Sequence, residues 1–226
     1  MARKLEGKVA VVTGASTGIG FAIAQGLIAE GAKRVYITGR SASTLEAAVA
    51  TLGDRAVAVI SDVSRQADLD ELRATIEDRH DQLDAVFANA GICEKNPLGE
   101  TSEAAYFNMF DINVKGVFFT VQTLMPLMKD GASIVLTASI CSSNGMEGLS
   151  LYNASKAAVR SFARTWANEL KGRKIRANVL SPGFTRTPLM DNGLKMSESD
   201  VAALRQHVDQ KSWRAGLEPV GMELAL

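Results

Sequence analysis

The chain alternates short runs of β-branched and other apolar residues with longer segments in which apolar residues recur at helical spacing. The short runs are apolar throughout, which is typical of strands that are covered on both faces. The predicted strands span residues 9–13, 34–38, 56–61, 85–88, 133–137 and 175–180. The predicted helices span residues 19–30, 41–52, 67–79, much of 102–128, and 151–170.

The unbroken alternation of strand and helix predicts parallel strands joined by crossover helices. With right-handed crossovers, this gives an α/β fold built on a doubly wound, Rossmann-like parallel sheet of six strands. No repeat, linker or low-complexity stretch divides the 226 residues, so we expect a single domain. Such sheets bind ligands at the carboxyl ends of their strands, and the residues found there decide the function.

The charge and the cysteine content reduce the number of function classes that fit this sequence. The 25 basic residues balance the 25 acidic ones, so no net field favours nucleic acid or an anionic membrane as a partner. The basic start lacks the apolar region of a secretory signal, and no apolar run is long enough to span a bilayer. Two cysteines, Cys93 and Cys141, are too few for a disulfide framework, which favours free thiols and a cytoplasmic location.

The first predicted strand leads into a glycine-rich segment that opens the first predicted helix. Glycines let a backbone turn sharply and approach a phosphate, and a helix N-terminus presents free N–H groups to an anion. The spacing differs from the common dinucleotide fingerprint, and a tight turn without a ligand is an equally good explanation of a glycine triplet. The candidate cofactor-binding residues of this segment are Gly14, Ser16, Thr17, Gly18, Ile19 and Gly20.

The second predicted strand ends in Thr38-Gly39-Arg40-Ser41. In a dinucleotide site, an acidic residue at this tip holds the ribose 2′-hydroxyl, whereas a basic residue accommodates a 2′-phosphate. Because Arg40 can pair with phosphate, the sequence favours NADP(H) over NAD(H). The alternative is that Arg40 is an ordinary solvated surface residue.

Two further strand ends carry small or polar residues. Asp62 and Val63 follow the third strand, where the Asp62 carboxylate either accepts from an adenine amino group or caps the next helix. Asn89, Ala90 and Gly91 follow the fourth strand, where small side chains leave room for a cofactor and Asn89 can hold the loop backbone. Local turn chemistry also explains both segments.

Tyr152 and Lys156 are four residues apart in a predicted helix and therefore share one face. A free phenol has a pKa of about 10, too high for a base at neutral pH. A nearby ammonium lowers that pKa, so the pair is a candidate general acid or base. Such pairs are also frequent on the surfaces of amphipathic helices.

Two further polar residues support a catalytic role for the Tyr152–Lys156 pair. Ser139 lies just beyond the fifth strand, where its hydroxyl can bond a substrate carbonyl or a developing alkoxide, or form a turn. Asn113 lies inside the long predicted helix, although asparagine is a poor helix former. Its position indicates a special role, such as bending the helix or holding a water molecule.

Taken together, these elements resemble the short-chain dehydrogenase/reductase family in its single-domain form. The matching elements appear in family order over roughly residues 5–190. They are Thr13-Gly14-x-x-x-Gly18-Ile19-Gly20, Asn89-Ala90-Gly91, Asn113, Ser139, Tyr152-x-x-x-Lys156 and Pro182-Gly183. Each element is weak alone, whereas their joint occurrence is highly specific.

The resemblance implies a role for each of these residues. Ser139 positions the substrate oxygen, Tyr152 acts as general acid or base, and Asn113 supports a proton-relay water. Lys156 lowers the pKa of Tyr152 and binds the nicotinamide ribose, while Pro182, Gly183 and Thr185 flank the nicotinamide. The expected activity is the NADP(H)-dependent interconversion of a small-molecule ketone, such as a 3-oxoacyl group, and a secondary alcohol. The remaining hypotheses are a dinucleotide sensor without turnover and a destabilised, truncated reductase.

Other residues receive weaker interpretations. His80 and His207 have no partners at ligand spacing, so we predict no metal site. The helical pattern of residues 197–211 resembles the family's mobile lid over the substrate, or else an ordinary surface helix. The pocket surface is expected to be of mixed polarity, with Glu94, Lys95 or Glu147 as the candidate charge clamps. Its residues are Ile140, Cys141, Gly145, Met146, Glu147, Asn153 and Phe184.

The C-terminal part, about residues 191–226, departs from the family pattern. After Lys211 we find neither the further helix nor the seventh strand that the family normally has. The strand at 175–180 should then lie at the sheet edge with unpaired backbone groups. We therefore expect lower stability and an oligomer simpler than the family's common tetramer, a homodimer formed through the helices at 102–128 and 151–170.

Overall fold

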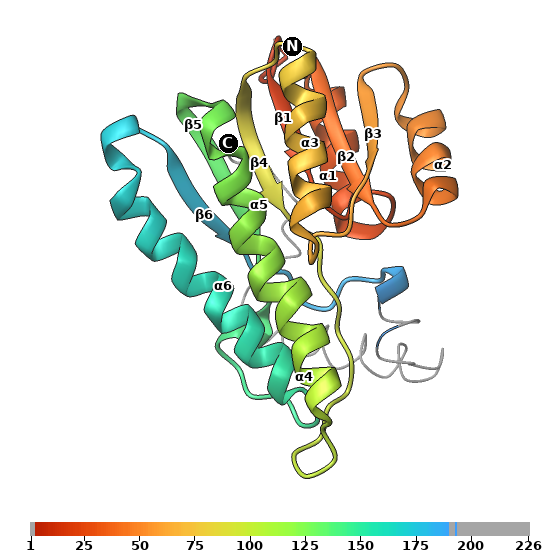
Figure 1. Ribbon diagram of the computed structural model, residues 1–226, viewed down its shortest axis with the longest axis vertical. Coiled ribbons are helices and arrows are strands. Elements are labelled where there is room, and N and C mark those ends of the chain that lie inside the picture. The colour runs from red at the N-terminus through yellow and green to blue at the C-terminus, as the bar shows by residue number, and fades with distance from the viewer. Residues whose placement is uncertain (1–2, 190–192, 194–226) are drawn as a thin grey trace, which may run out of the picture.

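The structure, a computed structural model, describes residues 3–189 and residue 193. Its centre is a sheet of six parallel strands in the order β3-β2-β1-β4-β5-β6 (Figure 1). The strands are β1 (Val9–Val12), β2 (Arg34–Gly39), β3 (Ala56–Ile60), β4 (Leu83–Ala88), β5 (Met128–Thr137) and β6 (Arg176–Leu180). The six predicted strands are therefore all present, and the predicted doubly wound α/β fold is confirmed.

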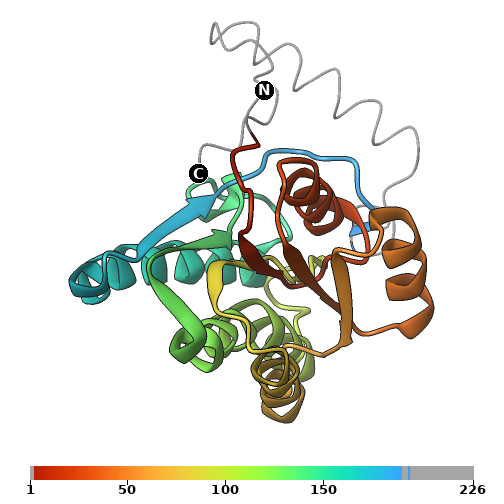
Figure 2. The same cartoon turned by 90° about the horizontal axis from the view of Figure 1, so that it is seen from above.

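Helices cover both faces of the sheet (Figure 2). They are α1 (Gly18–Ala29), α2 (Ala42–Leu52), α3 (Gln66–Asp78), α4 (Glu103–Phe110), α5 (Gly116–Leu124) and α6 (Ser150–Glu169). One core layer packs α1 and α2 against one face, through residues such as Ile23 and Leu45. The other packs α3, α5 and α6 against the opposite face, through residues such as Leu72, Val121 and Val159.

The chain reverses its direction of travel through the sheet between β1 and β4. Strands β2 and β3 lie on one side of β1, whereas β5 and β6 lie beyond β4. Since the connections leave these two central strands toward opposite faces, their carboxyl ends border a crevice. The segments after β1 and β4, which hold the glycine-rich loop and Asn89, meet at this crevice.

The predicted helix at 102–128 is divided, which corrects the sequence interpretation at two points. Residues Asp111–Lys115 form a π-helical turn between α4 and α5, with Asn113 at its centre. The end of the segment is a 3-10 turn, Met125–Leu127, and Met128 already belongs to β5. Pro126 explains the second break, because it lacks the N–H that an α-helix needs at that position.

Carboxylates anchor the opposite, amino-terminal edge of the sheet. Asp81, which is 5% exposed, accepts hydrogen bonds from Tyr36, Lys33 and Arg34. Burial alone would raise the pKa of Asp81, but these donors lower it. Asp84 accepts from the backbone N–H of Val9 and from two lysine side chains, and its pKa is likewise lowered against the effect of burial.

β6 is the last strand at one lateral edge of the sheet, and among the described strands it pairs with β5 alone. Most of its residues are half-buried or exposed. The lid helix expected at 197–211 and the tail that follows it lie outside the described residues, as does His207.

Candidate active site

A crevice of about 540 Å³ opens along the carboxyl ends of the strands. Most of the predicted site residues line it. They are Gly14, Ser16, Thr17, Gly18, Ile19, Arg40, Asp62, Val63, Asn89, Ala90, Gly91, Ser139, Tyr152, Lys156, Pro182, Gly183 and Thr185. Two predicted residues, Gly20 and Asn113, do not line it and lie behind its walls. The fold thus brings together residues from the segments that follow all six strands, and from α6.

The glycine-rich loop is held in place by Thr13 and Asn89. The Asn89 side-chain amide donates to the carbonyl oxygens of Thr13 (3.0 Å) and Gly14 (3.3 Å). In return, the Thr13 hydroxyl oxygen accepts from the backbone N–H groups of Asn89 and Ala90, each at 3.0 Å. The loops that follow β1 and β4 are therefore locked to each other.

Close packing behind the loop accounts for two of its glycines. Gly14 has a φ of +64°, and a Cβ there would lie 2.8 Å from Ala90 Cα. A Cβ on Gly20 would lie 2.5 Å from both the Asn89 side-chain nitrogen and the Gly14 carbonyl oxygen. Gly20 therefore shapes the loop from behind and does not form its surface.

The N-terminus of α1 points at the crevice with its first backbone N–H groups uncapped. The cap residue, Thr17, makes no side-chain capping bond, and the first turn contains no acidic residue. The buried Ser61 hydroxyl, on the wall of the same crevice, also has no hydrogen-bond partner. Open N–H groups and an unpartnered hydroxyl fit a bound phosphate-containing ligand, because the helix N-terminus favours an anion.

The far end of the crevice carries opposite charges. Arg40 is exposed at the tip of β2. Burial raises the pKa of Asp62, but the hydrogen bonds that Asp62 accepts from the Ser64 hydroxyl and backbone lower it, and the charges of Arg40 and Arg65 lower it further. Asp62 thus forms the local turn before α3 with one carboxylate oxygen while it also lines the crevice.

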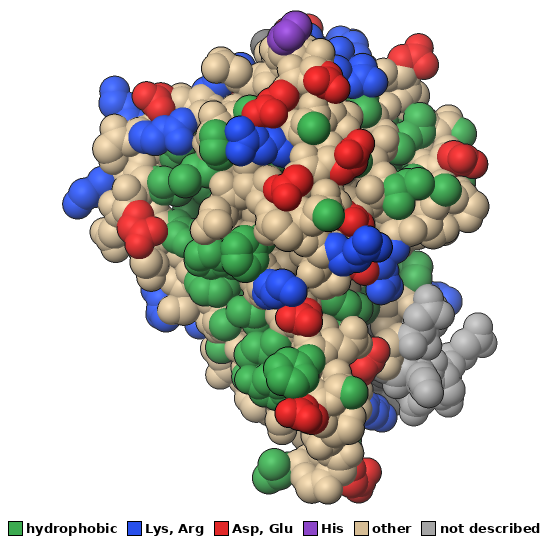
Figure 3. All heavy atoms as spheres, viewed as in Figure 1, with side chains coloured by type: hydrophobic (Ala, Val, Ile, Leu, Met, Phe, Trp, Pro, Cys, Tyr) green, Lys and Arg blue, Asp and Glu red, His purple; other side chains and the backbone are tan. Residues whose placement is uncertain are grey.

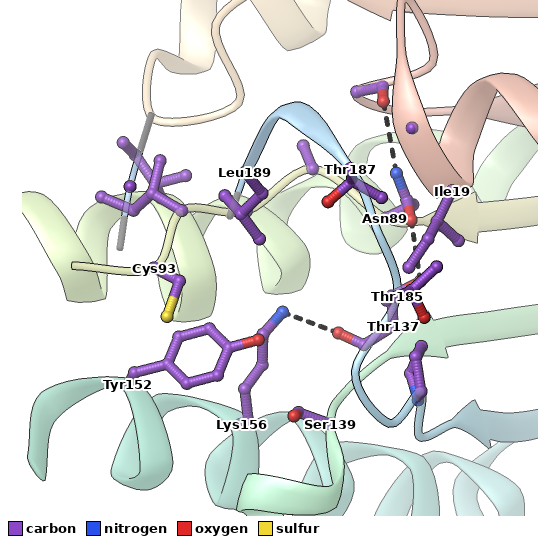
Figure 4. A pocket seen from close by; sticks show the side chains of 18 of the residues that line it. Ile19, Asn89, Cys93, Thr137, Ser139, Tyr152, Lys156, Thr185, Thr187 and Leu189 are labelled. Carbon is purple, nitrogen blue, oxygen red and sulfur yellow. Dashed lines mark hydrogen bonds between the residues drawn. The ribbon is translucent and has the colours of Figure 1, made fainter. Parts of the chain in front are cut away.

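Tyr152 and Lys156 both lie on the inner face of α6. The Lys156 ammonium is 5.7 Å from the centre of the Tyr152 ring and donates to the Thr137 carbonyl oxygen at 2.8 Å (Figure 4). Burial lowers the pKa of Lys156 to about 8. The shared face that the spacing predicts is therefore present.

The pKa of Tyr152 shifts in the direction opposite to the expectation. Burial raises it, the neighbouring thiols of Cys93 and Cys141 raise it further, and only the Ser139 hydroxyl lowers it. Tyr152 is therefore a protonated phenol at neutral pH.

Ser139 performs the turn-forming role that its sequence position allowed and also lines the crevice. Its hydroxyl oxygen accepts from the Cys141 backbone N–H at 3.1 Å and caps the short 3-10 turn Ile140–Ser142. Because the oxygen serves as an acceptor, the hydroxyl proton is available to another partner. The Tyr152 phenol is close enough for the two groups to interact.

Asn113 is fully buried in the π turn, where its side chain reaches the loop after β4. Its amide oxygen accepts from the Ile92 backbone N–H at 2.8 Å. Its amide nitrogen donates to the Ile92 carbonyl at 2.9 Å and to the Ser155 hydroxyl at 3.1 Å. The Ser155 hydroxyl in turn donates to the Tyr152 carbonyl at 2.7 Å. The asparagine therefore connects that loop to the helix that carries Tyr152.

The sequence interpretation missed several functional positions, of which Thr137 is the most informative. Its hydroxyl donates to the Asn89 side chain at 3.2 Å, and its carbonyl accepts from Lys156. It therefore joins the glycine-rich loop to the lysine (Figure 4). Only its place at the end of a predicted strand could have indicated this. Cys93 and Leu149 also line the crevice. Of the charge clamps that the sequence suggested, Glu94 lines it, whereas Lys95 and Glu147 do not, and Gly145 and Asn153 also lie outside it.

Within the described residues, no helix is long and apolar enough to cross a membrane. The same part of the chain holds no cluster of three or more side chains suited to a metal ion. Both cysteines are buried free thiols.

Comparison with known proteins identifies this arrangement. Residues 8–198 match the family model of the short chain dehydrogenases. The chain belongs to that family. It is a short-chain dehydrogenase/reductase, a family of oxidoreductases that bind a nicotinamide dinucleotide and interconvert carbonyls and alcohols.

Two curated members illustrate the relationship. An oxidoreductase of Sarocladium schorii, asL5, is 44% identical over 201 residues, which cover 86% of this chain and 80% of the relative. An NADP-dependent (R)-specific alcohol dehydrogenase of Lentilactobacillus kefiri is 38% identical over 199 residues, with 85% of this chain and 79% of that protein covered.

Solved structures support the same conclusion. The 3-ketoacyl-(acyl-carrier-protein) reductase of Brucella melitensis, crystallised with NADH, superposes with a TM-score of 0.80 at 32% identity. The match covers 85% of this chain and 82% of that one. The short-chain dehydrogenase fold thus extends over nearly all the described residues.

Proposed function

We propose that this protein is an NADP(H)-dependent reductase that converts a ketone to a secondary alcohol, with Tyr152 as the proton donor. The single observation that supports it best is the convergence of Ser139, Tyr152 and Lys156 on one crevice beside the glycine-rich loop. Burial keeps the phenol protonated, which is the state that a reduction requires of its general acid. When bound, the nicotinamide supplies the hydride.

The roles of the protein groups follow from their contacts. Ser139 donates its free hydroxyl proton to the carbonyl oxygen of the substrate and so orients it toward Tyr152. Tyr152 then gives its proton to the same oxygen as negative charge develops there. Lys156 lies beneath the ring with a pKa of about 8, so it can hold or release a proton near neutral pH. Asn113 keeps the loop after β4 and the Tyr152 helix in register through Ile92 and Ser155.

Replacement of the phenol tests the assignment of Tyr152. In Tyr152→Phe we expect kcat to fall by about a thousandfold, because a positioned general acid contributes rate enhancement on this order. The affinity for NADPH should stay within about twofold, as the phenyl ring still fills the same wall. Both are measured with purified protein, by the decrease in NADPH absorbance across a carbonyl panel and by fluorescence titration.

Tyr106→Phe is the matched control for this experiment, since it removes the same hydroxyl from an exposed tyrosine on α4 outside the crevice. It should retain wild-type turnover. Full activity in Tyr152→Phe would refute the assignment. Intact NADPH binding without any turnover in the wild type would instead favour a dinucleotide sensor.

The preference for NADP(H) rests on Arg40. It lines the crevice at the tip of β2, is exposed, and lies close enough to Asp62 to influence its pKa. A 2′-phosphate at this tip would gain a charge-assisted hydrogen bond from the guanidinium. The relative from Lentilactobacillus kefiri is described as NADP-dependent, whereas the Brucella melitensis structure contains NADH, so the family admits both cofactors.

Dissociation constants for NADPH and NADH test this preference. We expect the wild type to bind NADPH at least tenfold more tightly, and Arg40→Gln to reduce that ratio by about tenfold, the value of one charge-assisted bond. Arg65→Gln is the control, because it removes an equal charge near Asp62 from a residue that does not line the crevice. Tighter binding of NADH by the wild type would contradict the assignment.

We also propose that the protein is a homodimer formed through α4, α5 and α6. Apolar side chains gather over these helices (Figure 3). Tyr106 and Phe107 on α4 are 43% and 53% exposed, and Phe118 on α5 packs edge-on against Phe162 of α6. A surface of large aromatic side chains on adjacent helices is typical of a subunit interface.

A further inference from the structure

The crevice has two chemically different ends. The end beside the glycine-rich loop offers open backbone N–H groups, hydroxyl groups and the charged Arg40 and Asp62. The other end, around Tyr152, has an apolar wall to which Cys93, Cys141 and Met146 contribute sulfur atoms. The substrate must occupy this second end, because Tyr152 and Ser139 face it (Figure 4).

Two of these sulfur atoms are in direct contact, and the third residue packs in the same cluster. The Cys141 thiol donates to the Met146 thioether at 3.1 Å, and Cys93 packs in the same cluster as Cys141 and Tyr152. Cys93 and Cys141 are only 4% and 7% exposed. Burial raises the pKa of Cys93 to about 12, so this thiol is neutral at physiological pH. The wall is thus uncharged and polarizable, a surface that favours aromatic and other apolar groups.

The charges at the substrate end are unfavourable for an anion. Of the described residues that line it, Glu94 and Lys156 are the charged ones. Lys156 is 3% exposed and is engaged by the Thr137 carbonyl. Glu94 is half-buried next to Cys93 and presents a carboxylate. A carboxylate on the substrate would lose its hydration there and meet a like charge.

We infer that the substrates are uncharged ketones whose larger substituent is apolar and preferably aromatic. Cys93, Cys141 and Met146 bind that substituent, and Glu94 acts as a specificity residue that rejects keto acids. This inference rests on the proposed function, since it assumes that the carbonyl is reduced at Tyr152. It adds a substrate class and four specificity residues that the catalytic assignment does not include.

A matched pair of substrates tests the role of Glu94. Methyl 4-acetylbenzoate and 4-acetylbenzoate share one aryl ketone skeleton and differ by a negative charge. With NADPH, we expect the wild type to show a kcat/KM at least tenfold higher for the ester. Glu94→Gln should narrow that ratio severalfold by raising kcat/KM for the anion. Glu100→Gln removes an equal charge from an exposed residue of the same loop outside the crevice and should leave the wild-type ratio intact.

The sulfur wall is tested with a second pair, acetophenone and cyclohexyl methyl ketone. Met146→Leu preserves the size of the side chain but removes its sulfur, so we expect the preference for the aryl ketone to fall about two- to tenfold, the range of a sulfur–aromatic contact. An unchanged aryl preference in this variant would overturn the assignment of the wall.

The outcomes separate this inference from the function on which it rests. If none of the four ketones is reduced while NADPH still binds, the proposed reductase function fails. If the ketones are reduced but the anion is used as well as the ester, or Glu94→Gln leaves the ratio unchanged, the reductase function stands and the substrate class is wrong.

Discussion

Lys156, which we propose as a residue of the active site, lowers the stability of the fold. The fold buries its amine almost completely and gives it the Thr137 carbonyl as a partner. Burial lowers its pKa to about 8 from an ordinary value of 10.5. The unfolded chain therefore binds this proton up to a higher pH than the folded chain. The fold is penalised below pH 8, and the penalty is relieved as pH rises toward 10.5.

We accordingly expect Lys156→Met to raise the free energy of unfolding at pH 7 by about 2 kcal/mol, even after the loss of the bond to Thr137. The gain should shrink by more than half at pH 9.5, where the wild-type amine is neutral in the folded state. Urea denaturation at both pH values measures the difference. Equal gains at the two pH values would show that burial of the charge is not the cause.

At the scale of elements, the contact between α5 and the turn before α3 shapes the end of the crevice that Arg40 and Asp62 line. Gly116 begins α5 directly against Val63, which lines the crevice. A Cβ at Gly116 would lie 2.7 Å from a Val63 methyl group and 3.1 Å from the Val63 carbonyl oxygen. The helix can approach this closely only because the residue has no side chain.

Gly116→Ala should therefore destabilise the protein by about 1–3 kcal/mol, although alanine is the better helix former, because overpacking exceeds the gain in propensity. It should also weaken NADPH binding, since Val63 must move. Gly172→Ala is the control, as a Cβ there meets nothing within 4 Å. Denaturant unfolding measures the stability of both variants, and fluorescence titration measures their affinity for NADPH. A Gly116→Ala variant that is more stable than the wild type and binds NADPH equally well would contradict this account.

The elements themselves were largely predictable from the sequence. The apolar runs indicated every strand, because buried parallel strands need such runs on both faces. The division of the 102–128 segment was not predicted, although Asn113 indicated an unusual position in it. The side chain of Asn113 in the π turn exchanges hydrogen bonds with the backbone of Ile92, 21 residues away, and no local pattern contains that pairing.

The candidate site was predictable where a residue lies at a strand end or in a family motif. The links between those residues were not. Thr137 acts through its backbone carbonyl, which every residue has, and Ser155 acts between two helices. The direction of the Tyr152 pKa shift also depends on burial and on the Cys93 thiol, which only the assembled fold brings near.

At the scale of the whole molecule, we propose that the aromatic surface on α4, α5 and α6 forms the subunit interface. We expect light scattering after size exclusion to give the mass of a dimer. Phe107→Glu should shift it to a monomer by placing a charge in the interface. Ile60→Glu is the control, because Ile60 is 57% exposed but lies at the end of β3, away from these helices. A robust tetramer, or a dimer that survives Phe107→Glu, would contradict the proposal.

The carboxylates Asp81 and Asp84 have a consequence for how this protein can change over evolutionary time. They connect the strands at the edge of the sheet opposite the crevice. None of their side-chain partners lines the crevice. These partners are Tyr36, Lys33, Arg34, Lys8 and Lys129. Substitutions that adapt the substrate end to a new ketone therefore leave this anchorage untouched. A library restricted to the crevice walls should yield altered substrate ranges with few unfolded members, so the architecture favours divergence of activity within one stable scaffold.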